Sequence, residues 1–108
     1  MIATAGIEAD VIVETIGGIE IASQIAECAI NNRSDLITAN KALIADQGDE
    51  LTKNATENDR VILASASVGG GTPVLEAIRG KSVRSVRGVL NGTSNFVLDR
   101  LASGRSLS

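Results

Sequence analysis

Short apolar runs and longer amphipathic runs alternate along the first two thirds of this chain. Three runs rich in β-branched and other apolar residues predict strands, at residues 10–16, 35–39 and 60–64. Between the first two, the spacing i, i+3, i+4, i+7 and i+8 predicts an amphipathic helix, whose apolar stripe is formed by Ala22, Ile25, Ala26, Ala29 and Ile30. Strands and helices that alternate with short connections predict an α/β fold built on a parallel sheet with right-handed crossovers.

The connection between the second and third strands is predicted to contain two helical pieces. Asn40 can cap a helical turn that opens with Lys41. A further polar helix is expected from about Gly48 to Asn58, with Leu51 and Ala55 facing inward.

A glycine-rich stretch follows the third strand. Three consecutive glycines, residues 69–71, allow positive φ and a close approach of another molecule to the main chain. Thr72 is expected to cap a short helix that starts with Pro73 and ends before Gly80. A bare backbone beside a helix start can bind an anion through amides or a cation through carbonyls, and the sequence leaves both possibilities open.

The remaining chain has a less regular pattern. Val83 to Leu90 predicts a strand, and residues 91–95 form a turn into a helix that carries Val97, Leu98 and Leu101 and ends near Gly104. The changes of charge and pattern place a region boundary near residues 65 to 70.

Composition limits the core and the class of partner. Phe96 is the only aromatic residue among 108, so the core must consist of Ile, Val, Leu and Ala. The net charge of −3 divides into −8 over residues 1–59 and +5 over residues 60–108. The basic part is either a solvated surface or a nucleic-acid surface formed by Arg79, Lys81, Arg84 and Arg87. No aromatic side chain lies among these bases to stack on a nucleobase, so we expect no nucleic-acid partner.

The single cysteine and the absence of histidine exclude a disulfide framework and a zinc site of the usual ligands. Cys28 is expected to be a small hydrophobic residue on the buried face of its helix. No apolar run approaches the roughly 18 residues that span a bilayer, and no signal-peptide pattern is present at the N-terminus. We therefore expect a cytoplasmic protein without a membrane partner.

Three segments follow the predicted strands and are candidates for a ligand crevice: Gly17-Gly18, Asn40-Lys41 and the glycines at 69–71. Parallel sheets bind ligands beyond the carboxyl ends of their strands, so these segments should converge. Lys41 stands out because a cation at a helix start is opposed by the helix dipole. It is either a solvated lysine or a cation that polarises a carbonyl or holds a phosphate.

Two other motifs do not support a site on their own. Gly69-x-Gly71-x-x-Val74 lacks the third glycine of a dinucleotide fingerprint, and no acid follows the next predicted strand, so we reject it as a pyrophosphate loop. Thr93 and Ser94 have no histidine to act as their base, which argues against a serine hydrolase.

Three blocks taken together resemble homoserine dehydrogenases, in order and at the family's spacing. The blocks are Val13-Glu14-Thr15-Ile16-Gly17-Gly18, Thr38-Ala39-Asn40-Lys41-Ala42-Leu43, and Ser67-Val68-Gly69-Gly70-Gly71-Thr72-Pro73 followed by Asn91-Gly92-Thr93-Ser94-Asn95. The resemblance covers nearly the whole chain. It implies that the parent protein interconverts homoserine and aspartate 4-semialdehyde with NAD or NADP, on the route to threonine, methionine and isoleucine. It also implies that the parent protein is a homo-oligomer.

The resemblance also implies roles for individual residues. Those expected at the cofactor crevice are Thr15, Gly17, Gly18, Asn40 and Lys41. Lys41 would match the family's lysine next to cofactor and substrate, which makes it the expected catalytic residue. The family binds a monovalent cation, usually sodium, and the matching positions are Ser65, Val68, Gly70 and Thr72. At Ser65 the family commonly has a carboxylate, and a serine hydroxyl is a weaker, neutral ligand.

The same resemblance divides the chain into two parts. Residues 1–66 correspond to the C-terminal part of a Rossmann-type, doubly wound NAD(P)-binding domain, and residues 67–108 to the start of an α+β catalytic domain. The family's phosphate loop should precede Met1, and its catalytic Asp and Lys should follow Ser108. We therefore expect the isolated chain to be inactive. The alternatives are a non-catalytic relative that binds a partner through its basic half, and another oxidoreductase of the same architecture.

Overall fold

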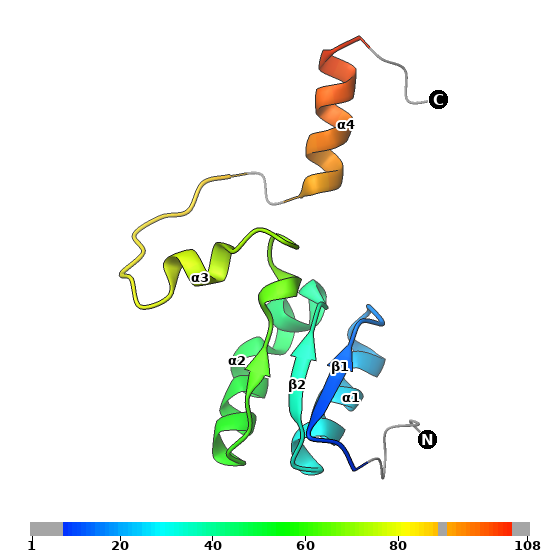
Figure 1. The fold of residues 1–108 in the computed structure, drawn as a ribbon, viewed down its shortest axis with the longest axis vertical. Coiled ribbons are helices and arrows are strands. Elements are labelled where there is room, and N and C mark those ends of the chain that lie inside the picture. Colours follow the sequence, from blue (N-terminus) through cyan, green and yellow to red (C-terminus); the bar gives the residue numbers. More distant parts are fainter. Residues whose placement is uncertain (1–7, 89–90, 105–108) are drawn as a thin grey trace.

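The computed structural model describes residues 8–88 and 91–104, and its centre is a parallel sheet of three strands (Figure 1). The strands lie in the order β1, β2, β3, and their bounds are Val11–Glu14, Asp35–Thr38 and Ile62–Leu63. Val11 lies opposite Asp35 in the β1–β2 register, and Leu36 lies opposite Ile62 in the β2–β3 register. The predicted parallel α/β sheet is confirmed, with strands shorter than the apolar runs that predicted them.

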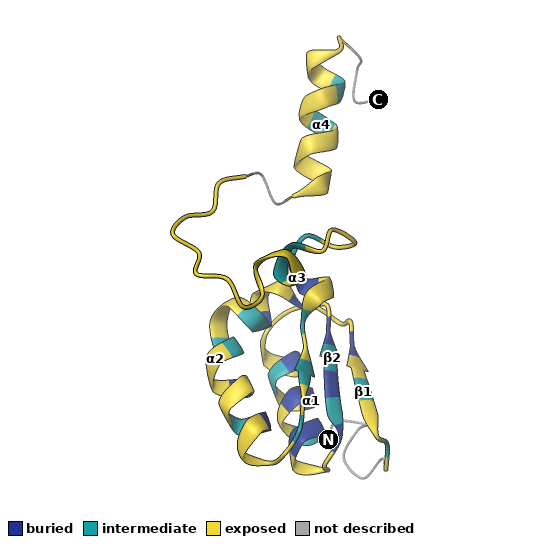
Figure 2. Cartoon of the chain, turned by 60° about the vertical axis from the view of Figure 1, so that its left-hand side comes forward, coloured by how far each residue is buried: buried dark blue, intermediate teal, exposed yellow. Residues whose placement is uncertain are grey.

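Helices α1 (Glu20–Asn31) and α2 (Lys41–Glu57) cover one face of this sheet (Figures 1 and 2). The buried residues between helices and sheet are Ala22, Ala26, Ala29, Ile30, Leu36, Leu43, Leu51 and Ala55. The predicted apolar stripe of α1 is confirmed, because all five of its residues are buried. Cys28 is only half-buried, so its expected place in the core is correct only in part.

The prediction of two helical pieces between β2 and β3 is wrong, because α2 runs without a break through Gly48. A glycine inside a helix costs about 1 kcal/mol relative to alanine. Burial of a leucine contributes about 1.5–3 kcal/mol, and α2 buries both Leu43 and Leu51, one on each side of the glycine. Packing on the sheet therefore outweighs the local propensity to break.

The chain leaves β3 through a 3-10 turn, η1 (Ser65–Ser67), and a glycine loop in which Gly69 and Gly70 have φ of 75° and 58°. The following helix, α3, spans Val74–Ile78. The prediction that Thr72 caps this helix and Pro73 begins it is wrong. Pro73 has a non-helical ψ of 61°, and no side chain caps α3. The Thr72 N–H instead donates to the Gly69 carbonyl at 3.1 Å, which closes the glycine turn before the helix can start.

The predicted strand at Val83–Leu90 is wrong over residues 83–88, which are exposed and irregular, while its last two residues lie outside the described range. A strand needs a neighbour for its backbone N–H and C=O groups, and none of the described strands pairs with this segment. The final predicted helix is confirmed as α4 (Gly92–Ala102), which projects away from the sheet (Figure 1). Gly104 follows it with a φ of 71°.

Within residues 8–88 and 91–104, none of the helices is both long and apolar enough to cross a membrane.

Candidate functional site

A buried hydrogen-bond network joins the carboxyl ends of β1 and β2. Glu14, the last residue of β1, is 1% exposed, and its Oε1 accepts hydrogen bonds from the N–H groups of Ile16 (2.7 Å) and Gly17 (3.4 Å). Its Oε2 accepts a hydrogen bond from the hydroxyl of Thr38 at 2.5 Å. Thr38 lies directly opposite Glu14 in the sheet register and also accepts from the backbone N–H of Asn40 at 3.0 Å. One carboxylate therefore contacts the turn after β1 and the end of β2.

The charge of Glu14 is stabilised by these neutral donors. Burial by itself raises the pKa of this carboxyl, but the hydrogen bonds from Thr38, Ile16 and Gly17 outweigh it, and the pKa lies below the ordinary glutamate value. None of the ion pairs among the described residues involves Glu14. The carboxylate is therefore ionised near neutral pH and acts only as an acceptor.

Gly17 and Gly18 form the turn after β1, with φ of 82° and 75°. A Cβ added at either glycine would meet nothing within 4 Å, so glycine is required for the backbone conformation and not for lack of room. The Gly18 carbonyl accepts a hydrogen bond from the side-chain amide of Asn40 at 2.5 Å. Hydrogen bonds to Glu14 and Asn40 thus hold the turn on its inner side, while its outer side is exposed and open to a ligand.

Asn40 caps α2, as the sequence predicts. Its Oδ1 accepts a hydrogen bond from the Leu43 N–H at 3.1 Å, and the residue is 5% exposed. Its Nδ2 holds Gly18, so the same side chain links the glycine turn to the start of α2. Lys41 is the first residue of that helix and is exposed. The backbone that carries the Lys41 ammonium is therefore attached directly to the network.

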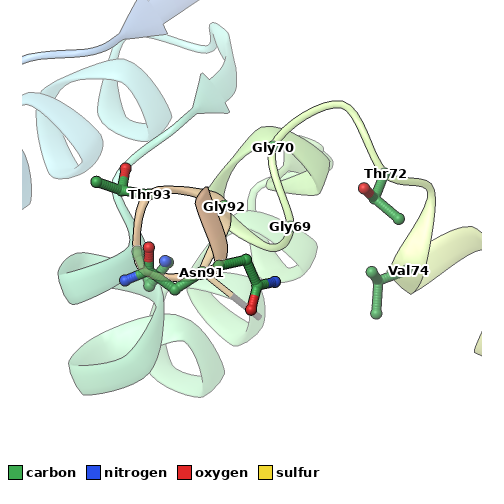
Figure 3. Close-up of a pocket in the computed structure, with 9 residues that line it drawn as sticks. Gly69, Gly70, Thr72, Val74, Asn91, Gly92 and Thr93 are labelled. Carbon is green, nitrogen blue, oxygen red and sulfur yellow. The ribbon is translucent and has the colours of Figure 1, made fainter. Parts of the chain in front are cut away.

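Lys41 lines a cavity of about 480 Å³ together with the glycine loop and the start of α4 (Figure 3). The other lining residues are Gly69, Gly70, Thr72, Val74, Asn91, Gly92, Thr93 and Asn95. In Figure 3, Thr72 and Val74 lie on the far side of the loop from Asn91 and Thr93. The structure thus brings Lys41 and the glycine loop together at the carboxyl end of the sheet, and adds the 91–95 turn to them.

The predicted site residues do not all reach this cavity. Gly17, Gly18, Asn40 and the exposed Thr15 are not among its lining residues. The Asn40 side chain holds Gly18, and Asn40 directly precedes Lys41, which does line the cavity. Of the four expected cation positions, Gly70 and Thr72 line the cavity, whereas Ser65 and Val68 do not.

Ser65 has a partner that the sequence did not suggest. Its hydroxyl donates to the Glu76 carboxylate on α3 at 2.6 Å. This hydrogen bond, a hydrogen bond from the Glu76 backbone and the nearby charge of Arg79 lower the pKa of the exposed Glu76 carboxyl. Glu76 thus places a negative charge beside Ser65. Among the described residues, no group of three or more His, Cys, Asp or Glu side chains could hold a metal ion.

Glu14 and Thr38 are the residues that sequence reasoning missed. The signal for Glu14 was present, because strand alternation places it on the same face as Ile12, which packs against the core. A carboxylate on the inward face of an apolar strand must find hydrogen-bond donors.

Comparison with known proteins places this geometry in a family. The sequence model of the family described as "Homoserine dehydrogenase, NAD binding domain" matches residues 1–65. The homoserine dehydrogenase of Pseudomonas aeruginosa is 43% identical over 98 residues, which cover 87% of this chain and 23% of the relative. That of Synechocystis is 37% identical over 97 residues, which cover 86% of this chain and 22% of the relative.

A solved homoserine dehydrogenase from Thiobacillus denitrificans has the same fold over most of this chain, with a TM-score of 0.75 and 36% identity. The match covers 87% of this chain and 23% of that structure. The chain therefore spans less than a quarter of the length of these relatives. These matches do not favour a non-catalytic protein that binds a partner through its basic half. The chain belongs to the homoserine dehydrogenase family.

Proposed function

We propose that this chain supplies part of the NAD(P)-binding crevice of an enzyme that interconverts L-homoserine and L-aspartate 4-semialdehyde. The observation that supports this most strongly is the position of Lys41, which shares a cavity with the glycine loop at the carboxyl end of a parallel sheet. In this proposal the Lys41 ammonium lies where a substrate oxygen would meet the nicotinamide ring.

The residues of the two turns have distinct roles in this proposal. The open outer side of the Gly17–Gly18 turn, with Thr15 and Asn40, would border the nicotinamide. When bound, NAD or NADP in its oxidised form would accept the hydride from the carbon that carries the homoserine hydroxyl, and the hydroxyl proton would be released to solvent. Lys41 would bind the substrate oxygen and stabilise the negative charge that develops on it.

The oxygens of the glycine loop suit a sodium ion in composition. We assign its ligands to the Ser65 hydroxyl and the carbonyls of Val68, Gly70 and Thr72, and Glu76 supports the assignment by adding a carboxylate beside Ser65. The Thr72 carbonyl already accepts a hydrogen bond from the Val74 N–H at 2.7 Å, which leaves one lone pair for the ion.

The proposal extends to the organisation of the parent protein. Residues 1–66 would close the nucleotide-binding domain and residues 67–108 would open the catalytic domain, which is supported by the absence of any buried residue after Ser67 in the described part. The parent would be a cytoplasmic homo-oligomer that serves threonine, methionine and isoleucine synthesis. The isolated chain would oxidise homoserine immeasurably slowly, since it holds only part of the crevice.

The test is Lys41→Ala in a full-length homoserine dehydrogenase that contains this segment. Removal of one preorganised donor at a developing charge typically lowers kcat by 10²–10³-fold, so we expect a loss of at least about 100-fold in homoserine oxidation. Lys53→Ala is the matched control, because Lys53 lies on the same helix with a side chain 77% exposed. Equal rates for Lys41→Ala and the unsubstituted enzyme would remove Lys41 from the mechanism.

A further inference from the structure

The buried carboxylate of Glu14 connects the two parts of the proposed crevice. We infer that Glu14 is a positioning residue of the dehydrogenase site, which fixes the Ile16–Gly18 turn and, through Thr38 and Asn40, the start of the helix that carries Lys41. This inference rests on the proposed function and assigns a role to a residue that touches neither cofactor nor substrate in it.

The hydrogen bonds form a closed circuit. Glu14 accepts from the backbone N–H groups of Ile16 and Gly17 on one side and from the Thr38 hydroxyl on the other. Thr38 accepts from the Asn40 N–H, and the Asn40 side chain returns to the Gly18 carbonyl. Movement of any one member therefore disturbs both the glycine turn and the cap of α2.

The direction of each hydrogen bond depends on the charge at position 14. An ionised carboxylate can only accept, so the Thr38 hydroxyl must donate to it and keeps its lone pairs for the Asn40 N–H. A glutamine of the same shape would present its amide N–H₂ either to Thr38, whose hydroxyl would then lose its acceptor, or to the turn, where the Ile16 and Gly17 N–H groups would both lose theirs. Charge-assisted hydrogen bonds are also roughly twice as strong as neutral ones.

Core packing does not require a charge at this position. Glu14 lies on the inward face of β1 beside Ile12, where an apolar side chain would extend the core without desolvation of a carboxylate. What the carboxylate adds is a fixed geometry for two backbone N–H groups and a hydroxyl at the mouth of the proposed crevice and, through that hydroxyl, for the Asn40 N–H. That geometry is needed for ligand binding more than for folding.

The experiment uses a full-length homoserine dehydrogenase that contains this segment. We expect Glu14→Gln to raise the Kd for NADH or NADPH, titrated without amino-acid substrate, by about tenfold, and to lower kcat for homoserine by a similar factor. Glu50→Gln, which removes the same charge from an exposed position on α2, should change both by less than about twofold.

A second pair of variants tests the route through Thr38. Thr38→Val removes the hydroxyl and should weaken nucleotide binding as much as Glu14→Gln does, while Thr38→Ser, which restores it, should recover most of the affinity. In the double variant Glu14→Gln/Thr38→Val the two effects should not add, since both break the same circuit.

The outcomes separate this inference from the proposed function. If the unsubstituted enzyme oxidises homoserine but Glu14→Gln changes only the Tm, with Kd and kcat unaltered well below that temperature, Glu14 is merely structural and the inference is wrong. If Glu14→Gln does not fold, normal nucleotide binding by Thr38→Val overturns the inference instead. If the unsubstituted enzyme neither binds the nucleotide nor oxidises homoserine, the proposed function fails and the inference fails with it.

Discussion

The described chain divides into a sheet region, residues 8–67, and a second region, residues 69–88 and 91–104. Both regions carry large apolar side chains, but only the sheet region buries any of them. Leu36 and Leu43 of the sheet region are fully buried, whereas Phe96 and Leu98 of α4 are 57% and 59% exposed. The centre of the Phe96 ring instead lies 4.9 Å from the guanidinium carbon of Arg100, one turn further along the same helix. The same local pattern therefore produces a helix in both regions but a core in only one.

The sheet region itself repeats this contrast on its two faces. Ile12, Leu36 and Ile62 face α1 and α2 and pack in the core, while Val13 and Leu63 on the other face are 64% and 47% exposed. Parallel sheets are normally covered on both faces. Apolar patterning thus determines which side chains require cover, and burial depends on whether a partner element is present.

The largest expected effect is on the stability of the core. Leu36→Ala should lower the free energy of unfolding of this chain by about 2–5 kcal/mol, because Leu36 is fully buried. Leu98→Ala on α4 is the matched substitution in the second region and should change it by no more than about 0.5 kcal/mol. Urea denaturation measures both values. An equal loss in the two variants would show that α4 packs as firmly as the sheet.

The caps of α2 and α4 provide a comparison of equivalent groups. Asn40 and Asn91 each accept a backbone hydrogen bond at 3.1 Å, from Leu43 and Ser94, but only Asn40 is buried and also holds Gly18. Asn40→Ala should cost about 1–2 kcal/mol of global stability. Asn91→Ala should reduce helicity in α4, measured by circular dichroism, and leave the thermal midpoint of the sheet region unchanged. A lower midpoint for Asn91→Ala would contradict the separation of the two regions.

The smallest effect is a dependence of stability on pH that is confined to the sheet region. The pKa of Glu14 is lower in the folded chain than in the unfolded chain, so its contribution to stability is present above the unfolded pKa and is lost as the pH falls through the folded pKa. Glu14→Gln should therefore flatten the decrease of stability at acidic pH. Glu76 is exposed, so Glu76→Gln should leave the pH profile nearly unchanged. If the free energy of unfolding falls equally steeply with decreasing pH in Glu14→Gln and in the unsubstituted chain, the conclusion that Glu14 is ionised in the folded chain would be wrong.

The sequence by itself determined the elements that depend on local spacing. The three strands, the buried stripe of α1 and the cap Asn40 follow from alternation, helical periodicity and side-chain chemistry within a few residues. The motif blocks likewise indicated the family, and with it the candidate lysine.

Only the tertiary structure decided the features that depend on distant partners. Packing on the sheet carried α2 through Gly48, and the lack of a neighbouring strand left residues 83–88 irregular. The circuit of Glu14 and Thr38 joins residues 24 positions apart, which no local pattern relates. The reason is physical, because periodicity is a property of neighbouring residues, whereas burial and hydrogen-bond satisfaction depend on what the fold brings beside them.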